Sequence, residues 1–324
     1  MTVAAAILLR MANGRGGKGG VRVGTASWTD PTLIKSGWYP KGASSAEARL
    51  RFYATQFPIV EVDAGYYYLP REDQAGLWVE RTPPDFVFNI KAFSLLTGHP
   101  TRRKALPEDL LEEVAPEHRD KQRLYASHLS ADGLAEVWRR FQEALLPLDS
   151  AGKLGAVLLQ YPEWFTPRRS NREELRAVRD HLPGYQVCVE FRNGTWMAEG
   201  RDRERTLELL SELGLPLVCV DMPQGFRSSL PPVAEVTSPD LAVVRFHGRD
   251  PKAWEKKTVS ERFRYRYEED ELREWVPKVE HLADGAREVH VLMNNCYQDY
   301  ATTNAQQLMD LLSSADVPVT LPGA

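Results

Sequence analysis

Short apolar runs alternate with amphipathic stretches along the chain from residue 21 onwards. The apolar runs are rich in β-branched and aromatic residues and are bounded by Gly, Pro or polar residues, which is typical of buried strands. Most of the intervals between them place apolar residues at helical spacing, as in 45–57, 134–148 and 202–213. The pattern predicts eight strands, at 21–27, 60–66, 86–93, 156–162, 186–192, 216–221, 241–248 and 289–295.

Eight strands that alternate with helices predict an α/β fold with a parallel sheet closed into a TIM-type (β/α)8 barrel. An open doubly wound sheet is the alternative, but no Gly-rich phosphate-binding sequence follows the first strand. Residues 94–131 form a long insertion after the third strand, which we expect to act as a lid or binding loop. We expect one barrel domain over 21–315, with a disordered lead-in at 1–20 and a tail at 316–324.

The outer face of a barrel strand packs on helices and must be apolar, so polar residues at alternating positions are predicted to point inward. In the stretch VCVEFR, Glu190 and Arg192 share a face with Cys188, while Val189 and Phe191 take the other face. The same alternation predicts which side chains of the other strands point inward. They are Glu61, Asp63, Asn89, Lys91, Leu158, Gln160, Cys219, Asp221, Arg245, His247 and one of Asn294 and Asn295.

Most of these charged residues lie at the carboxyl ends of strands, where a barrel builds its active site. Unpaired burial of such charges costs too much, so we predict one hydrogen-bonded network in which Glu190 pairs with Lys91, Arg192 or Arg245. A purely structural network of ion pairs is the alternative. The number of convergent polar groups under a long loop favours a ligand site.

The composition is that of an ordinary globular protein, with 43% hydrophobic and 27% charged residues. A net charge of −4 argues against a surface that binds polyanions generally. The three cysteines have no metal-binding spacing and form no even disulfide set, which indicates a reducing cytoplasm. The stretch AAAILL is too short to span a bilayer, no later segment is apolar enough to do so, and translation from Met11 is an alternative start.

Several motifs occur in one order along the chain: VGTASW with GWYP, FPIVEVDAGYY, WVERTPPDFVFNIKAF, KLGAVLLQYPEWF, VEFRNGTW, RFHGR and MNNCYQDYATTNAQQL. Through them the chain resembles the YecE-like family, also called domain of unknown function 72, from Val21 to about Leu312. The resemblance implies a barrel of the TIM type and no particular reaction. Since the family more often carries Asn at position 63, Asp63 is a weaker candidate for a shared role.

The first functional hypothesis is an enzyme, a hydrolase or lyase without a metal or other cofactor, that uses general acid/base chemistry on a small substrate carrying phosphate or carboxylate. We expect the anion to bind between Arg192 and His247, because the acids leave about one positive charge unneutralised. The catalytic candidates are Glu190, His247 and Lys91. The binding candidates are Arg192, Arg245, Asp63, Gln160, Trp196, Asn294, Asn295 and Asn304.

Two of these residues have plainer interpretations, because Trp196 could be core and Asn304 could cap a helix. A sugar hydrolase with Trp28, Trp38 and Trp196 as platforms is a second alternative, although the cations suit phosphate better. A metal-dependent phosphodiesterase is a third, but only His247 among the histidines follows a strand.

The last alternative is nucleic-acid binding through residues 245–267, which hold eight basic and three acidic residues interleaved with aromatic ones. Packing of those aromatic rings on the barrel rim competes with this interpretation. The sequence leaves the oligomeric state open.

Overall fold

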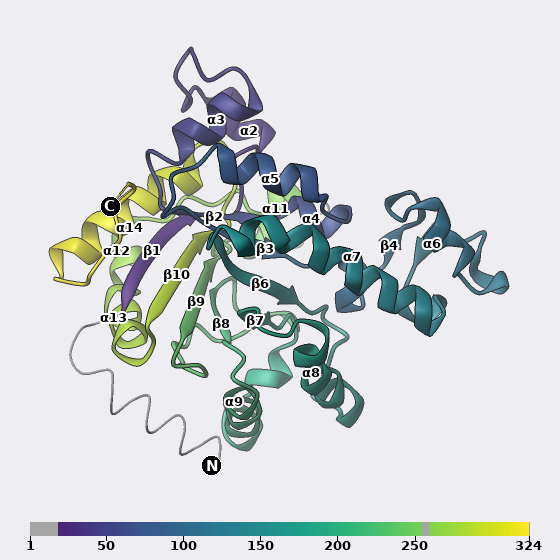
Figure 1. Ribbon diagram of the computed structural model, residues 1–324. Coiled ribbons are helices and arrows are strands. Elements are labelled where there is room, and N and C mark those ends of the chain that lie inside the picture. Colours follow the sequence, from purple (N-terminus) through teal and green to yellow (C-terminus); the bar gives the residue numbers. More distant parts are fainter. Residues whose placement is uncertain (1–18, 255–258, 324) are drawn as a thin grey trace.

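A computed structural model of the protein describes residues 19–254 and 259–323, in which eight parallel strands form a nearly closed barrel surrounded by helices (Figure 1). The strands are β1 (Gly20–Thr25), β2 (Ile59–Val62), β3 (Val87–Lys91), β6 (Leu154–Gln160), β7 (Val187–Glu190), β8 (Val218–Asp221), β9 (Leu241–Phe246) and β10 (Glu288–Met293). Neighbouring strands follow the order β7-β6-β3-β2-β1-β10-β9-β8. A backbone hydrogen bond of 2.9 Å from Val189 N to Pro216 O brings β8 beside β7, and the predicted TIM-type barrel is confirmed.

Helices occupy the intervals between the strands. They are α2 (Pro31–Ser36), α3 (Ala46–Tyr53), α4 (Ala64–Tyr67), α5 (Glu72–Glu80), α7 (Ala131–Ser150), α8 (Arg169–His181), α9 (Arg201–Leu213), α10 (Pro251–Trp254), α11 (Val259–Arg262), α12 (Glu269–Arg273), α13 (Val276–Gly285) and α14 (Tyr300–Ser314). Residues 222–240, between β8 and β9, contain no helix, as their Pro- and Ser-rich sequence predicted.

Local sequence signals set several helix ends. The side chain of Ser45 accepts a hydrogen bond from Ala48 N at the start of α3, and that of Ser130 accepts one from Gly133 N at the start of α7. Gly214 ends α9 with a φ of 60°, a left-handed conformation that glycine adopts without strain. These caps let each helix pack its apolar face on the outside of the barrel.

The insertion after β3 is built from short elements. They are η1 (Ser94–Thr97), β4 (Thr101–Arg102), η2 (Arg103–Ala105), α6 (Glu108–Glu112), η3 (Pro116–His118), β5 (Arg123–Leu124) and η4 (Ala126–His128). Strands β4 and β5 pair antiparallel, and this part extends beyond one end of α7 (Figure 1). The beginning of the insertion reaches the barrel mouth, where the His99 ring lies 5.3 Å from the Tyr66 ring. A lid function stays a prediction.

The ends of the described chain meet beside β1. Val21 N donates to Pro318 O at 2.9 Å, and Thr320 N donates to Val21 O at 2.8 Å. Val317 is buried, so part of the segment assigned to a tail packs on the barrel. Nearly all of the predicted lead-in, residues 1–18, lies outside the described residues.

Among the helices that the structure describes, none combines the length and the hydrophobicity needed to span a lipid bilayer.

Candidate functional site

Polar side chains from β2, β3, β6, β7 and β9 and from the segments just after them meet inside the carboxyl end of the barrel. The strand register pairs Glu61 with Asn89 and Gln160 with Glu190, so these residues of β2, β3, β6 and β7 share one face, as the alternation predicted. The predicted network is confirmed for Glu61, Asp63, Lys91, Gln160, Glu190, Arg192, Arg245, His247 and Asn294.

Arg245 lies at the centre of this network and has no exposed surface. Its Nη1 donates to Glu190 Oε2 and its Nη2 to Glu61 Oε1, while Asp63 Oδ1 lies 4.0 Å from Nη2. Burial lowers the pKa of Arg245, but the Glu190 and Glu61 carboxylates outweigh it and raise the pKa above its usual value. One buried guanidinium therefore bridges two buried carboxylates.

The second carboxylate oxygen of Glu190 lies close to three side-chain nitrogen atoms. Glu190 Oε1 lies 2.6 Å from Arg192 Nε, 2.8 Å from Gln160 Nε2 and 3.2 Å from His247 Nε2. Burial raises the pKa of Glu190, but Arg192, Arg245 and His247 together hold it well below its usual range. Glu190 is therefore ionised at neutral pH, and it pairs with Arg192 and Arg245, as predicted.

His247 is enclosed and neutral. The Asn294 amide donates to Nδ1 at 2.8 Å, which leaves the hydrogen on Nε2, facing Glu190. Burial and then the charge of Arg192 lower the pKa of His247 to about 3. Arg192 Nη2 lies only 3.3 Å from His247 Nε2, so the anion expected between these two side chains has no room there.

Lys91 and Arg192 are two cations that reach the open end of the barrel, with 12% and 14% of their side chains exposed. Lys91 Nζ lies 3.4 Å from Asp63 Oδ1 and 4.7 Å from the centre of the Tyr66 ring. Burial, and after it the charges of Lys91 and Arg192, lower the pKa of His99 to about 3. Because both cations act on the same imidazole, they face a common region at the barrel mouth.

Glu61 differs from Glu190 in the number of hydrogen bonds that it accepts. Its Oε1 accepts from Arg245, but within the described residues its buried Oε2 has no hydrogen-bond partner. Burial raises the pKa of Glu61 to about 7; Arg245 opposes this shift and Asp63 adds to it. The alternation predicted that Glu61 points inward but did not mark it as a candidate for catalysis, since the number of donors around a carboxylate follows from tertiary packing.

Trp196 belongs to the hydrophobic core. It is fully buried, its indole nitrogen donates to Phe165 O at 2.6 Å, and its ring stacks on Phe191 at 4.3 Å between centres. The prediction that Trp196 binds a ligand was wrong, because three aromatic rings pack together beneath the loop after β7.

Asn295 and Asn304 both hydrogen-bond to the backbone of a loop. Asn295 Nδ2 donates to Tyr265 O at 2.9 Å, and Asn304 both donates to Tyr267 O and accepts from Tyr267 N. The prediction of a binding role was wrong for Asn304, whose two amide atoms both bond to the protein, and Asn304 does not cap α14, which begins at Tyr300. Within the described residues Asn295 Oδ1 has no hydrogen-bond partner, so a binding role for Asn295 stays a prediction. Of the two adjacent asparagines, Asn294 is the one that faces the network.

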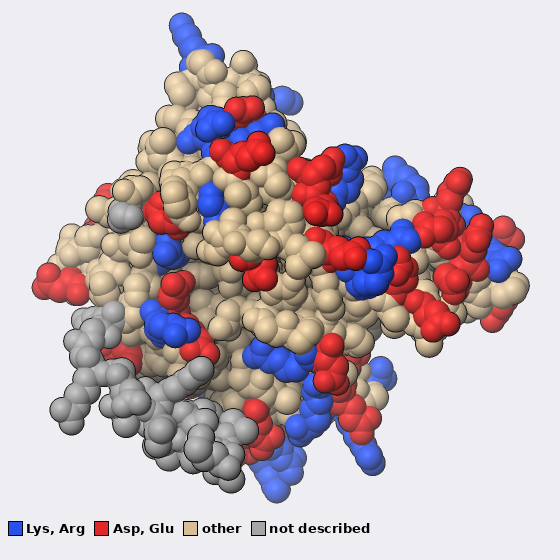
Figure 2. All heavy atoms as spheres, in the orientation of Figure 1, with Lys and Arg blue, Asp and Glu red and all other residues tan. Residues whose placement is uncertain are grey.

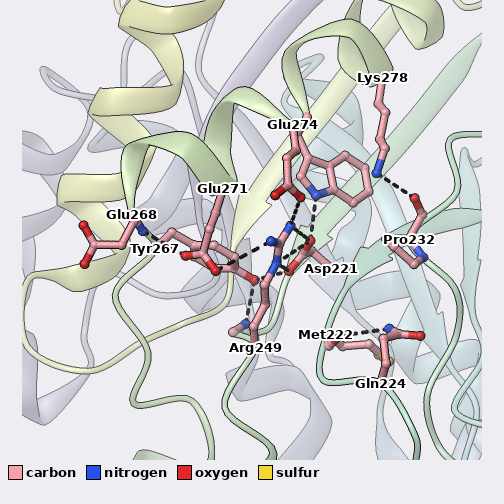
Figure 3. Close-up of polar contacts among 12 residues, drawn as sticks. Asp221, Met222, Gln224, Pro232, Arg249, Tyr267, Glu268, Glu271, Glu274 and Lys278 are labelled. Carbon is pink, nitrogen blue, oxygen red and sulfur yellow. Dashed lines mark hydrogen bonds and ion pairs between the residues drawn. The ribbon is translucent and has the colours of Figure 1, made fainter.

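Asp221 points out of the barrel, into a second polar cluster (Figure 3). The register pairs it with Phe246, whose ring packs on Tyr267 and Trp275 in the outer layer. Its carboxylate accepts from the Tyr267 hydroxyl and the Trp275 indole nitrogen, both at 2.7 Å, and from Arg249 Nη2 at 2.8 Å. The prediction that Asp221 joins the inner acids was wrong, and this cluster instead ties the segment after β9 to α12 and α13.

Replacing Asp221 with asparagine is expected to destabilise the protein by about 2 kcal/mol, because one oxygen that accepts hydrogen bonds becomes an amide facing donors. Urea unfolding followed by circular dichroism measures this loss. The control is Glu274→Gln, which removes a second, largely exposed partner of Arg249 and is expected to change stability by less than about 1 kcal/mol. Equal losses in the two variants would contradict a structural role for Asp221.

The aromatic residues of the stretch 245–267 pack inward. Trp254 and Tyr267 are buried, the Phe263 ring lies 5.9 Å from the His247 ring, and Trp254 lies 5.3 Å from the Arg192 guanidinium. Residues 255–258 of this stretch lie outside the described residues. The burial and ring contacts of these side chains favour the packing interpretation over nucleic-acid binding. On the one face of the molecule that Figure 2 shows, acidic and basic side chains are interspersed.

Within residues 19–254 and 259–323, no group of three or more His, Cys, Asp and Glu side chains is arranged to hold a metal ion. The metal-dependent phosphodiesterase alternative therefore receives no support from the described side chains.

Comparison with known proteins adds a family and several solved structures. The family model described as "Protein of unknown function DUF72" matches residues 22–323. The UPF0759 protein YunF of Bacillus subtilis (strain 168) is 30% identical over 297 residues, which cover 90% of this chain and 94% of that protein.

Two solved structures of DUF72 family proteins share the fold. The protein from Thermotoga maritima MSB8 is 30% identical, with a TM-score of 0.71 and coverage of 91% of this chain and 99% of that one. The protein from Enterococcus faecalis V583 is 26% identical, with a TM-score of 0.70 and coverage of 91% and 98%. No reaction or ligand is named for these relatives.

Proposed function

Because the chain belongs to the DUF72 family of proteins of unknown function, we propose a function from the geometry of the barrel mouth: an enzyme that acts on a small anionic substrate by general acid/base chemistry. Lys91 and Arg192 bind the anionic group, and Glu61 exchanges the proton. The observation that carries the proposal is the pair of cations facing the open end of the barrel, next to a buried carboxylate, one oxygen of which has no hydrogen-bond partner in the part of the chain that is described.

Lys91 and Arg192 suit an anionic group because each keeps part of its side chain open to the barrel mouth. Glu190 and Trp254 hold the Arg192 guanidinium in place, and Asp63 and Tyr66 hold the Lys91 ammonium. Cations that are positioned before the ligand arrives lose little conformational freedom when they bind phosphate or carboxylate oxygens. Their joint effect on the pKa of His99 supports a positive potential at the mouth.

Proton transfer suits Glu61 better than the two groups that the sequence favoured. Glu190 is held ionised by its cations, and both ring nitrogens of the neutral His247 contact other side chains. Among the described residues, one carboxylate oxygen of Glu61 has no hydrogen-bond partner, and its pKa of about 7 lets Glu61 both accept and release a proton near neutral pH. In this proposal Glu190, Arg245 and His247 position the reacting groups.

Inorganic phosphate is expected to bind at the mouth, to raise the melting temperature and to raise the pKa of His99 from about 3, because the anion offsets the charges of Lys91 and Arg192. NMR titration of the His99 ring with and without phosphate measures this shift. Lys91→Met is expected to weaken phosphate binding at least about tenfold, since it removes one charge-assisted hydrogen bond.

The matched control is Lys121→Met, which removes an exposed lysine on the insertion and is expected to leave phosphate binding unchanged. A His99 titration that phosphate does not move, together with equal phosphate binding by the Lys91→Met variant, would refute the anion site. Screening phosphorylated and carboxylated metabolites for turnover with the wild type and Glu61→Gln then tests the catalytic half of the proposal.

A further inference from the structure

A cavity of about 230 Å³ lies beside the barrel mouth, between residues 27–29 after β1, helices α3 and α5, and the end of β2. Its volume equals that of roughly seven or eight water molecules in the liquid, which is room for a small organic molecule. Glu61 and Asp63 line it on the barrel side. The cavity is therefore next to the proposed catalytic carboxylate but separate from Lys91 and Arg192, which do not line it.

The unpartnered oxygen of Glu61 is the feature that calls for a ligand here. Glu61 is fully buried, and its Oε2 has no hydrogen-bond partner in the part of the chain that the structure describes. A buried oxygen without a donor costs about 1–3 kcal/mol, so such atoms in a folded protein need a physical reason. A ligand group that donates a hydrogen bond to Oε2 would remove this cost.

The walls of the cavity combine aromatic rings with small polar groups. The Trp28 and Trp78 rings stand at 87° to each other with 5.8 Å between their centres, and Leu50 adds an apolar wall. Ser27 and Thr29 also line the cavity, and Ser27 Oγ accepts a hydrogen bond from Thr29 N at 3.1 Å. Apolar faces with a few placed polar groups match a molecule whose carbon–hydrogen faces pack on rings while its hydroxyls form hydrogen bonds.

The charges around the cavity favour an uncharged donor. The cations Arg245, Arg192 and Lys91 together balance the carboxylates Glu61, Glu190 and Asp63, so a further full cation is not required for neutrality. Arg81 also lines the cavity, and its Nη2 lies 3.6 Å from Glu47 Oε2. A hydroxyl group satisfies Oε2 without adding charge to this balanced set.

We propose that this cavity binds the hydroxylated, uncharged part of the substrate, so that the substrate is a sugar or polyol that carries an anionic group. The link between the two halves is Asp63, which lines the cavity and whose Oδ1 lies 3.4 Å from Lys91 Nζ. One molecule then places a hydroxyl at Glu61 and its anion at Lys91 and Arg192. The anionic half of this inference rests on the proposed function, and the hydroxyl half rests on the cavity alone.

Binding of D-ribose, inorganic phosphate and D-ribose 5-phosphate to the full chain tests the inference, with tryptophan fluorescence and calorimetry as readouts because Trp28 and Trp78 line the cavity. Ribose is expected to give a saturable signal, and ribose 5-phosphate is expected to bind at least about tenfold more tightly than either part, because the two sites are linked in one molecule. Glu61→Gln and Ala46→Leu, which narrows the cavity, are expected to weaken ribose binding at least about tenfold. Ala135→Leu on α7, outside the cavity, is the matched control.

The cavity for the hydroxylated part and the site for the anion can be refuted independently of each other. If ribose gives no saturable signal and Ala46→Leu leaves ribose 5-phosphate binding unchanged, the inference is overturned, while phosphate binding that depends on Lys91 still supports the proposed function. If ribose binds and phosphate does not, the cavity is supported and the proposed function is overturned. Tighter binding of ethanolamine than of ribose would overturn the uncharged class of ligand, because it would show that the Glu61 carboxylate selects a cation.

Discussion

Replacing Arg245 with methionine is expected to lower the free energy of unfolding by about 3–5 kcal/mol, because it leaves two buried carboxylates without the cation that they share. Arg245, Glu61 and Glu190 have no exposed surface, and the guanidinium donates to both carboxylates. Methionine fills much of the volume but donates no hydrogen bond, so water or added protons must stabilise Glu61 and Glu190 in the variant. Urea unfolding at neutral pH, followed by circular dichroism, measures the loss.

Two further variants separate charge from packing. Arg245→Met combined with Glu61→Gln and Glu190→Gln is expected to recover a large part of the stability, because no unpaired charge then remains buried. Arg139→Met, which removes an exposed arginine paired with two glutamates on α7, is expected to cost less than about 1 kcal/mol. A loss below 1 kcal/mol for Arg245→Met alone would show that the inner network does not stabilise the barrel.

The stability that wild-type Glu61 provides relative to Glu61→Gln is expected to fall by about 3 kcal/mol as the pH rises from 4.5 to above 7. The pKa of Glu61 is raised from 4.5 to about 7 in the folded protein, so between these values the folded state binds more protons than the unfolded state. The contribution is therefore fully present below pH 4.5 and is lost as the pH rises through 7. Urea unfolding of both proteins across this range gives the difference.

The difference between the two proteins isolates Glu61 from the histidines. Burial lowers the pKa values of His247 and His99, which destabilises the fold as the pH falls below 6.5, but this effect is common to wild type and variant and cancels. Carbon NMR of the Glu61 carboxyl group provides a direct check. A stability difference that stays flat, or that grows with pH, would contradict the raised pKa and with it the choice of Glu61 for proton transfer.

The alternation of polar and apolar residues along single strands predicts most members of the inner network correctly. In β2, β7 and β9, a charged residue stands between apolar neighbours that must face the helices, so Glu61, Glu190 and Arg245 have one allowed direction. In β8 the run VCVD offers no such contrast, because cysteine and valine are both buried readily. The lateral pairing of Asp221 with Phe246 decided its direction, and the chain pattern carries no record of that register.

The alternation of inward and outward side chains does not continue into the loops after the strands, so the sequence alone does not fix the direction of the side chains there. The sequence allows Trp196 to be a ligand platform or a core residue. Its contacts with Phe165, 31 residues away in the sequence, and with Phe191 place it in the core. The sequence allows Asn304 to cap a helix, but its side chain bonds to the backbone of Tyr267, 37 residues away in the sequence. Contacts at such separations follow from how the elements pack.

The sequence by itself determined the eight-stranded barrel and the charged character of its carboxyl end, because both follow from periodicities within single segments and from the cost of burying unpaired charge. Only the tertiary structure decided which carboxylate is surrounded by donors and which is not. It surrounded Glu190 with three cationic or hydrogen-bond donor groups besides Arg245, whereas Glu61, which lines a cavity, has one oxygen without a hydrogen-bond partner in the described residues. The physical reason is that a carboxylate's protonation depends on the number and distance of the donors around it, and most of those donors, such as Gln160 and Arg245 at Glu190, lie on strands that are distant in the sequence.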